Sequence, residues 1–267
     1  MREMSLAALT VLELSPVEMV RCAAAAGYSH VGLRLLPATP TEPVWDMIGD
    51  TSMLREVASA LADTGIRVLD VEIVRLQPEV NVRKFEAMLA TGARLGARYV
   101  LVAGNDPDEA RLTSNLAALC ALAAPLKLAV YLEPMPWTDV RDLTQAARIV
   151  DAAAQANAGV LIDPIHFDRA GNRAAQIAAV PAQRLGYLQF CDAPAAHPTS
   201  LDELLHQARA ERQLPGEGGL DLRGILAAVP LDAPLSLEIP MQSRRLPALE
   251  RARLALRATQ GFVSDRP

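Results

Sequence analysis

The stretch GVLIDPIHF, residues 159–167, begins as an apolar run and ends on polar groups. Its apolar part leads directly into Asp163, which is followed by a proline and, three residues further on, by His166. The same order, an apolar run that ends in a carboxylate and is stopped by a proline, recurs in AVYLEPMPW (129–137) and PLSLEIPM (234–241). A pattern used three times predicts strands whose ends contribute to one common site.

Eight short apolar segments are spread along the whole chain. They lie at 5–11, 30–36, 67–74, 99–104, 128–133, 159–163, 185–192 and 234–240. Several are continuous hydrophobic runs without in/out alternation, which is typical of parallel strands covered on both faces. Longer amphipathic segments separate them, so each strand and helix unit takes about 30 residues.

This alternation predicts an α/β protein, a single (β/α)8 TIM barrel that takes in residues 1–267 as one domain. A doubly wound open sheet is the alternative. It is less consistent with the sequence, because no glycine-rich phosphate-binding turn follows the first strand.

The helical segments carry recognisable start and stop signals. In SPVEMVRCAAAAG, Ser15 is a candidate N-cap, Glu18 completes a capping box, and Gly27 ends the helix. The regular spacing is broken once, where more than 40 residues separate the seventh and eighth strands. We expect this insertion, at about 193–222, to lie over the face of the barrel where active sites are built.

Composition excludes several classes of protein. The net charge is −5 and there is no basic stripe, which argues against a nucleic-acid surface. No apolar stretch approaches the roughly 20 residues of a membrane span. Three widely spaced cysteines without a CxxC pair indicate reduced thiols, so we expect a cytoplasmic protein. The N-terminal apolar run is interrupted by Thr10 and Glu13, which favours a first core strand over a signal peptide.

Four oxygen-bearing side chains fall at the ends of strands five to eight: Glu133, Asp163, Gln189 and Glu238. In a closed barrel these ends are neighbours around one half of the mouth. Three of the four are anionic, so the cluster repels itself unless a cation lies among them. Because hard divalent cations prefer carboxylate and amide oxygens, we expect Mg²⁺ or Mn²⁺ rather than Zn²⁺.

Each of these residues also has a structural interpretation. An acidic residue at one strand end is commonly the N-cap of the next helix, and Gln189 could satisfy backbone groups. His166 is either a loop histidine or a group beside the metal. We expect Asp192 to cap the insertion and Cys191 to pack in the core.

Further residues are candidates for binding a substrate. Arg209 and Arg212 lie one helical turn apart on the insertion and could bind a carboxylate or a phosphate, or else be solvated. Glu72 and Asn105 end the third and fourth strands. Arg34, in the second strand, is a weaker candidate.

At these residues the sequence resembles the xylose-isomerase-like TIM-barrel superfamily of sugar-phosphate isomerases and epimerases. The motifs that carry the resemblance are YLEP, DPIH, QFCDAP and SLEIP. In that family a Glu, an Asp, a His and a Glu bind one divalent metal, and the two Glu act on opposite faces of the substrate. The resemblance implies these roles for Glu133, Asp163, Gln189 and Glu238, with Gln189 standing where many epimerases have His.

The C-terminal half is similar to bacterial 3-dehydroshikimate dehydratases, which also place Gln at this position. The shared runs read QFCDAP, RAERQLPGEG and PLSLE here, and Trp137 also fits. The first half departs from this pattern. HVGLRLLP lacks the expected acidic residue at the second strand, and Met135 stands where a His is expected.

These observations lead to three hypotheses about function. The leading one is a metal-dependent isomerase or epimerase of a sugar-like hydroxy-carbonyl compound, with Glu133 and Glu238 as base and acid. The alternative is a dehydratase of a 3-dehydroshikimate-like acid, in which His166 moves the proton. The third is a non-catalytic barrel that binds a small molecule. A multi-zinc endonuclease would need more than the four histidines present. A homo-oligomer is compatible with the sequence.

Overall fold

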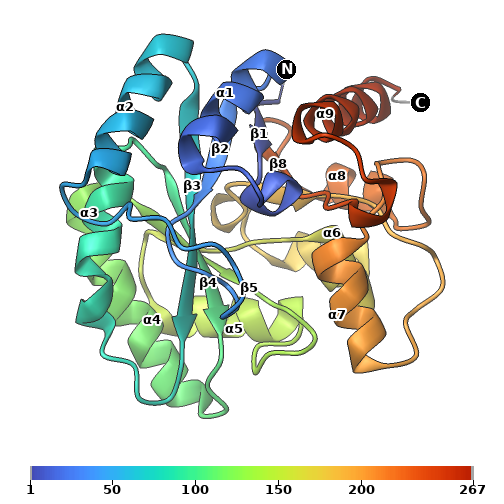
Figure 1. The fold of residues 1–267 in the computed structure, drawn as a ribbon. Helices are drawn as coiled ribbons and strands as arrows, with labels where there is room; N and C mark the ends of the chain where they lie inside the picture. The colour runs from blue at the N-terminus through green and yellow to red at the C-terminus, as the bar shows by residue number, and fades with distance from the viewer. Residues whose placement is uncertain (1, 266–267) are drawn as a thin grey trace.

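The computed structural model describes residues 2–265 and shows eight parallel strands with helices between them. The strands are β1 (Met4–Leu6), β2 (His30–Arg34), β3 (Arg67–Leu76), β4 (Tyr99–Gly104), β5 (Ala129–Glu133), β6 (Ala158–Val160), β7 (Leu188–Phe190) and β8 (Leu235–Leu237). The α-helices are α1 (Pro16–Ala26), α2 (Ser52–Thr64), α3 (Glu86–Arg94), α4 (Glu109–Ala123), α5 (Leu143–Ala153), α6 (Pro164–Arg169), α7 (Leu201–Ala210), α8 (Leu222–Ala228) and α9 (Ala248–Ser264) (Figure 1). Short 3₁₀ helices are η1 (Ala8–Val11), η2 (Val82–Phe85), η3 (Ala124–Leu126), η4 (Ala174–Ala179), η5 (Ala182–Arg184) and η6 (Gln242–Arg244).

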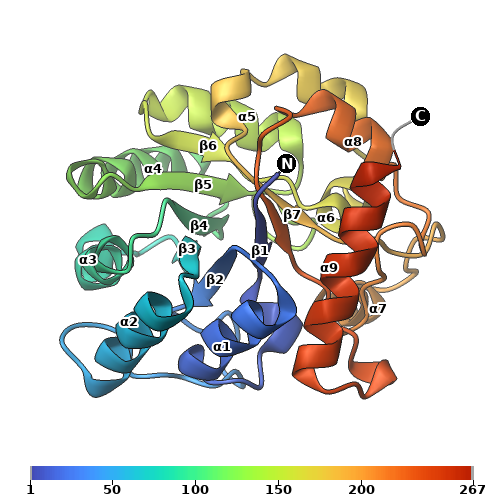
Figure 2. The ribbon, with the colours of Figure 1, turned by 90° about the horizontal axis from the view of Figure 1, so that it is seen from above.

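The strands curl into a barrel. Their order is β6-β5-β4-β3-β2-β1-β8-β7, so neighbours in sequence are neighbours in space. A bridge between Ile162 and Leu188 joins the two ends, where the Gln189 backbone N–H donates to the Ile162 carbonyl at 3.1 Å. Helices surround the strands when the barrel is seen from above (Figure 2). The predicted (β/α)8 TIM barrel is confirmed.

The first predicted strand is shorter than expected. The prediction of a strand across 5–11 is wrong after Leu6, because 8–11 form η1. There the Thr10 hydroxyl donates to the Leu237 carbonyl and accepts from the Ile239 N–H, each at 2.8 Å. A side chain therefore makes the bonds that a longer strand would make, and an apolar run cannot distinguish the two arrangements.

The predicted capping signals at the first helix are confirmed. The Ser15 N–H donates to the Glu18 carboxylate at 2.8 Å, and the Ser15 side chain accepts from the Glu18 N–H. Gly27 ends α1 with a φ of 97°, which glycine adopts without strain.

Three tyrosines fill one level of the barrel interior. The ring of Tyr99 stacks on Tyr187 at 4.6 Å between centroids and meets Tyr131 edge-on at 5.0 Å. Gly159, which opens the quoted stretch, leaves room for this cluster. A Cβ there would lie 2.4 Å from Tyr131 Cζ and 2.8 Å from the Arg184 carbonyl oxygen.

We therefore expect Gly159→Ala to lower the free energy of unfolding by about 1–3 kcal/mol, because the core is already filled. Urea denaturation measures this. The matched control is Gly261→Ala in α9, where an added Cβ meets no atom of the described residues within 4 Å. The control should be stabilised by about 0.5–1 kcal/mol. Equal effects in both variants would contradict the packing argument.

The amino-terminal end of the barrel strands holds a buried histidine. His30 begins β2 and is 1% exposed, with Nδ1 2.8 Å from the Ser29 hydroxyl and Nε2 3.6 Å from Glu3 Oε1. Burial lowers the pKa of His30 from 6.5 to about 4, against the opposing attraction of Glu3, and nearby Arg67 and Arg98 add to the lowering.

This histidine makes stability depend on pH. Its pKa is lower in the folded protein, so the unfolded chain binds more protons between pH 6.5 and 4. Its contribution is fully present above pH 6.5 and is lost as the pH falls to about 4, by up to about 3 kcal/mol in total. Urea denaturation at a series of pH values should show this loss, and His30→Gln should flatten it. An unchanged pH profile in the variant would contradict the assignment.

Candidate active site

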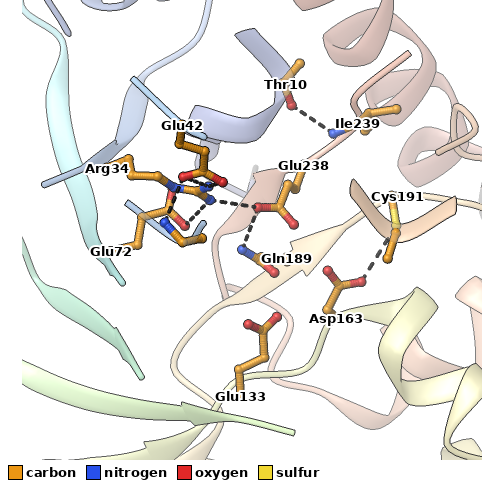
Figure 3. A network of polar contacts seen from close by, with 12 residues as sticks. Thr10, Arg34, Glu42, Glu72, Glu133, Asp163, Gln189, Cys191, Glu238 and Ile239 are labelled. Carbon is orange, nitrogen blue, oxygen red and sulfur yellow. Dashed lines mark hydrogen bonds and ion pairs between the residues drawn. The ribbon is translucent and has the colours of Figure 1, made fainter. Parts of the chain in front are cut away.

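The four predicted metal ligands meet at the carboxyl ends of β5 to β8. Glu133 ends β5, Asp163 caps α6 just after β6, Gln189 lies in β7, and Glu238 follows β8. Each is at most 4% exposed. Figure 3 shows their polar ends facing a common space. Three of the four, all except Asp163, line a cavity of about 470 Å³, a volume that includes its opening to solvent.

Two buried oxygens of the four candidate ligands have no protein donor among residues 2–265. They are Gln189 Oε1 and Glu133 Oε1, and both are fully buried. The other end of the amide is occupied, because Gln189 Nε2 donates to Glu238 Oε1 at 3.2 Å. Buried acceptors are costly unless paired, and a divalent cation satisfies them directly. The donor set therefore fits a divalent cation.

A histidine completes the cluster. One ligand atom each from Glu133, Asp163 and His166 lies within 4.8 Å of the others. His166 Nε2 is 3.7 Å from Asp163 Oδ2 and 3.8 Å from Glu133 Oε1. Its Nδ1 has no hydrogen-bond partner in the described part of the chain. The structure thus brings His166 to the predicted site.

The surroundings of the buried acids change their pKa values in different directions. Burial raises the pKa of Glu133 well above its usual value, and the Asp163 and Glu238 carboxylates add to the rise. Burial also raises the pKa of Glu238, to about 7, although Arg212 opposes it. Burial alone would raise the pKa of Asp163 too. The adjacent Arg212 guanidinium, together with His166, has a larger effect than burial, so the pKa of Asp163 is lowered. Burial lowers the pKa of His166 to about 4, so its imidazole is neutral at pH 7.

Arg212 lies inside the carboxylate cluster. Its Nη1 is 2.6 Å from Asp163 Oδ2 and its Nη2 is 2.7 Å from Glu238 Oε2. Nε donates to the Ala208 carbonyl at 2.7 Å, and the side chain is 2% exposed. The guanidinium is thus fixed between two predicted metal ligands, which the spacing on the insertion did not indicate.

A second ion network lies beside the first. Arg34 Nη1 is 2.9 Å from Glu42, and its Nη2 is 3.3 Å from Glu72 and 4.0 Å from Glu238 (Figure 3). Sequence reasoning missed Glu42, because it lies in the irregular segment after β2 where no periodicity marks it. Arg34 links Glu72 to Glu238, one of the four candidate ligands.

The remaining predicted substrate contacts divide into two groups. Glu72, Trp137 and Arg209 line the cavity together with Arg212. Asn105 does not line it; its Oδ1 accepts from Arg75 Nη1 at 3.1 Å, and Arg75 does line it. Arg75 was not singled out from the sequence, because an arginine near a strand end is usually solvated.

The insertion after β7 is held by Asp192, as predicted. Its carboxylate accepts from the backbone N–H groups of Ala193, Gly216, Gly218 and Leu220 at 2.9–3.1 Å. This fixes α7 over the mouth and places Arg209 and Arg212 at the cavity. Cys191 is fully buried, with Sγ 3.7 Å from Asp163 Oδ1.

Comparison with known proteins places this geometry in context. Residues 20–260 match the family model "Xylose isomerase-like TIM barrel". A 3-dehydroshikimate dehydratase from Pseudomonas aeruginosa is 32% identical over 205 residues. That match covers 69% of this chain and 31% of the relative, so the chain corresponds to about a third of the relative's length.

Solved structures agree on the fold. The zinc-bound IOLI protein is 21% identical, with a TM-score of 0.80 and 98% of both chains covered. A D-allulose 3-epimerase from Methylomonas sp. is 15% identical, with a TM-score of 0.72 and 98% of both chains covered. In the described residues no helix is long and apolar enough to cross a membrane. On the match across most of its length, this chain belongs to the xylose isomerase-like TIM-barrel family.

Proposed function

We propose that the protein is a metal-dependent dehydratase that acts on a cyclic hydroxy-ketoacid of the 3-dehydroshikimate type. The observation that carries this proposal is a difference in the contacts made by the two glutamates, Glu238 and Glu133. Glu238 contacts Arg212, Arg34 and Gln189, whereas Oε1 of Glu133 receives no hydrogen bond within residues 2–265. The similarity to dehydratases at the level of sequence supports the same choice.

Glu133, Asp163, Gln189 and Glu238 would hold the divalent cation, which we expect to be Mn²⁺ or Mg²⁺ because all four donors are oxygens. When bound, such a cation supplies Lewis-acid polarisation of a substrate carbonyl oxygen and so makes the adjacent C–H more acidic. Arg212 keeps the Asp163 and Glu238 carboxylates in fixed positions.

His166 is the group that we expect to move the proton. It is neutral at pH 7, lines the cavity, and has a free ring nitrogen in the described structure. It accepts the proton from the carbon next to the carbonyl. The hydroxyl on the following carbon then leaves and takes up the proton that His166 carries, so that water is lost, the imidazole is neutral again and a carbon–carbon double bond forms. The rings of Trp137 and His166 lie nearly perpendicular to each other, with 4.8 Å between centroids, and this contact orients the imidazole.

An epimerase or isomerase remains the second candidate. It needs two proton-transferring groups on opposite faces of the substrate. Glu133 and Glu238 both line the cavity, and burial raises the pKa of Glu238 to about 7, close to that of a working acid. Against this, the contacts of Glu238 to two arginines restrain it, whereas His166 is unrestrained by any ion pair shorter than 3.7 Å.

The test uses metal-stripped protein reloaded with Mn²⁺. 3-Dehydroshikimate should lose water to give an aromatic dihydroxy acid, followed by ultraviolet absorbance, and His166→Gln should abolish the reaction while keeping Mn²⁺ binding by calorimetry. Exchange of the substrate proton with D₂O, together with conversion of D-allulose, would favour the epimerase instead. Metal binding without exchange or turnover of either compound would leave a binding protein and refute the proposal.

A further inference from the structure

Four arginines line the cavity, and two of them are paired with protein carboxylates. Arg34 pairs with Glu42 and Glu72, and Arg212 pairs with Asp163 and Glu238. These two guanidinium groups neutralise buried acids and have little capacity left for a ligand. Of the two insertion arginines for which the sequence suggested an anion-binding role, Arg212 is therefore excluded and Arg209 is left.

The other two arginines, Arg75 and Arg209, make no ion pair with any carboxylate of residues 2–265. Arg75 comes from β3 and is held by neutral acceptors, Asn105 Oδ1 at 3.1 Å and the Ala38 carbonyl at 3.2 Å. Arg209 comes from α7 and lies over the Trp137 ring, 5.7 Å from its centroid. Both are thus positioned without being neutralised.

The positive charges of Arg75 and Arg209 repel each other. Burial lowers the pKa of Arg75, and the Arg209 charge is the next largest cause. Like charges that converge on one cavity repel each other, and the repulsion is relieved when an anion binds between them. A further donor is available at the same wall, because Trp137 Nε1 is buried without an acceptor in the described chain.

We propose that Arg75 and Arg209 form an oxyanion subsite that binds the carboxylate of the substrate, with Asn105 and Trp137 as the residues that position them. This inference rests on the proposed function and adds how the acid is recognised. A planar guanidinium presents paired N–H donors that match a carboxylate, and two of them from different elements fix the orientation of a ring. The ring then reaches from this subsite towards His166 and the four metal-ligand candidates, which line the same cavity or adjoin it.

The subsite explains a feature of the site that metal binding leaves unexplained. Asn105 does not line the cavity, yet its amide oxygen accepts a hydrogen bond from Arg75, which does line it. A lysine at position 75 could not make both the Asn105 and the Ala38 contacts through one planar group. We therefore expect Asn105 to affect the affinity for the acid through Arg75 and without touching it.

The experiment is calorimetry on the Mn²⁺-loaded full chain with 3,4-dihydroxybenzoate, the product that loss of water from 3-dehydroshikimate gives. Its neutral amide, 3,4-dihydroxybenzamide, is the matched ligand, and inorganic phosphate tests the other source of an oxyanion. The acid should bind roughly 10–100-fold more tightly than the amide, the range expected for a charge-assisted hydrogen bond. Arg75→Gln and Arg209→Gln should each remove about tenfold or more for the acid and leave the amide unchanged.

Two controls keep this result separate from the proposed function. Arg257→Gln, on the exposed face of α9, should bind the acid as the unaltered protein does. Mn²⁺ affinity should be the same in all variants, so loss of acid binding is not loss of the metal. Equal binding of acid and amide, or unchanged acid binding in both arginine variants, overturns the subsite. Phosphate that displaces the acid at equal concentration overturns its assignment to a carboxylate. A failure of dehydration with the arginine effects intact would refute the reaction alone.

Discussion

Arg212→Met in the metal-free protein is expected to lower the free energy of unfolding by about 3–5 kcal/mol. The guanidinium is the ion-pair partner of two buried carboxylates, Asp163 at 2.6 Å and Glu238 at 2.7 Å. Methionine fills similar space but leaves both acids inside the barrel without this cation. Breaking a buried pair by removing one partner costs more than the pair contributes, because the remaining charges stay desolvated.

Equilibrium denaturation in urea measures this loss, and Arg257→Met provides the control. Position 257 is exposed on α9, so its replacement should change stability by about 0.5 kcal/mol or less. Saturating Mn²⁺ should restore part of the stability of Arg212→Met, because a divalent cation can take over the neutralising role. A loss below about 1 kcal/mol in the metal-free variant would show that the acids are not dependent on Arg212.

Glu133→Gln is expected to have opposite effects on metal binding and on stability. Affinity for Mn²⁺ should fall by about 100-fold or more, since even indirect partners of a metal commonly contribute 10–100-fold. The metal-free protein should be more stable by about 1–2 kcal/mol at pH 7. Burial and the nearby Asp163 and Glu238 raise the pKa of Glu133, so its ionised form is unfavourable when no cation is bound.

The size of this stability change depends on pH. A raised pKa in the folded state means that the folded protein holds its proton more tightly than the unfolded chain. The stability that Glu133 contributes is present below pH 4.5 and is lost as the pH rises. Glutamine does not ionise, so the variant does not undergo this loss. Calorimetry and urea denaturation at two pH values measure both effects. Glu56→Gln, on the exposed face of α2, is the control. Destabilisation of Glu133→Gln without metal would contradict the argument.

The positions of the candidate ligands could be predicted because a parallel barrel leaves few choices. A strand that ends in Glu133 or Asp163 must place that residue at the mouth, since strand direction is the same for every unit. His166 followed from its spacing of three residues after Asp163, one turn of α6. In these cases the local sequence pattern and the regular barrel topology together determine where the side chain lies.

Other parts of the site depend on loops. Glu42 lies in a segment without periodicity, and Arg75 is distinguished only by its neighbours Asn105 and Ala38. Arg212 could be named as a site residue, but whether it contacts a ligand or the protein's own acids depends on the path of the insertion. That path is set by Asp192 and its four backbone donors.

The barrel, the order of its strands and the carboxylates at its mouth can all be inferred from the sequence, because strand periodicity, capping and strand ends are local properties that the topology repeats. The pairing of the charges depends on the folded chain. Within residues 2–265, Arg34 and Arg212 are paired with acids in the site, and Arg75 and Arg209 are not. Coulomb interactions depend on distance and burial between residues far apart in the chain, and neither quantity can be read from their spacing in the sequence.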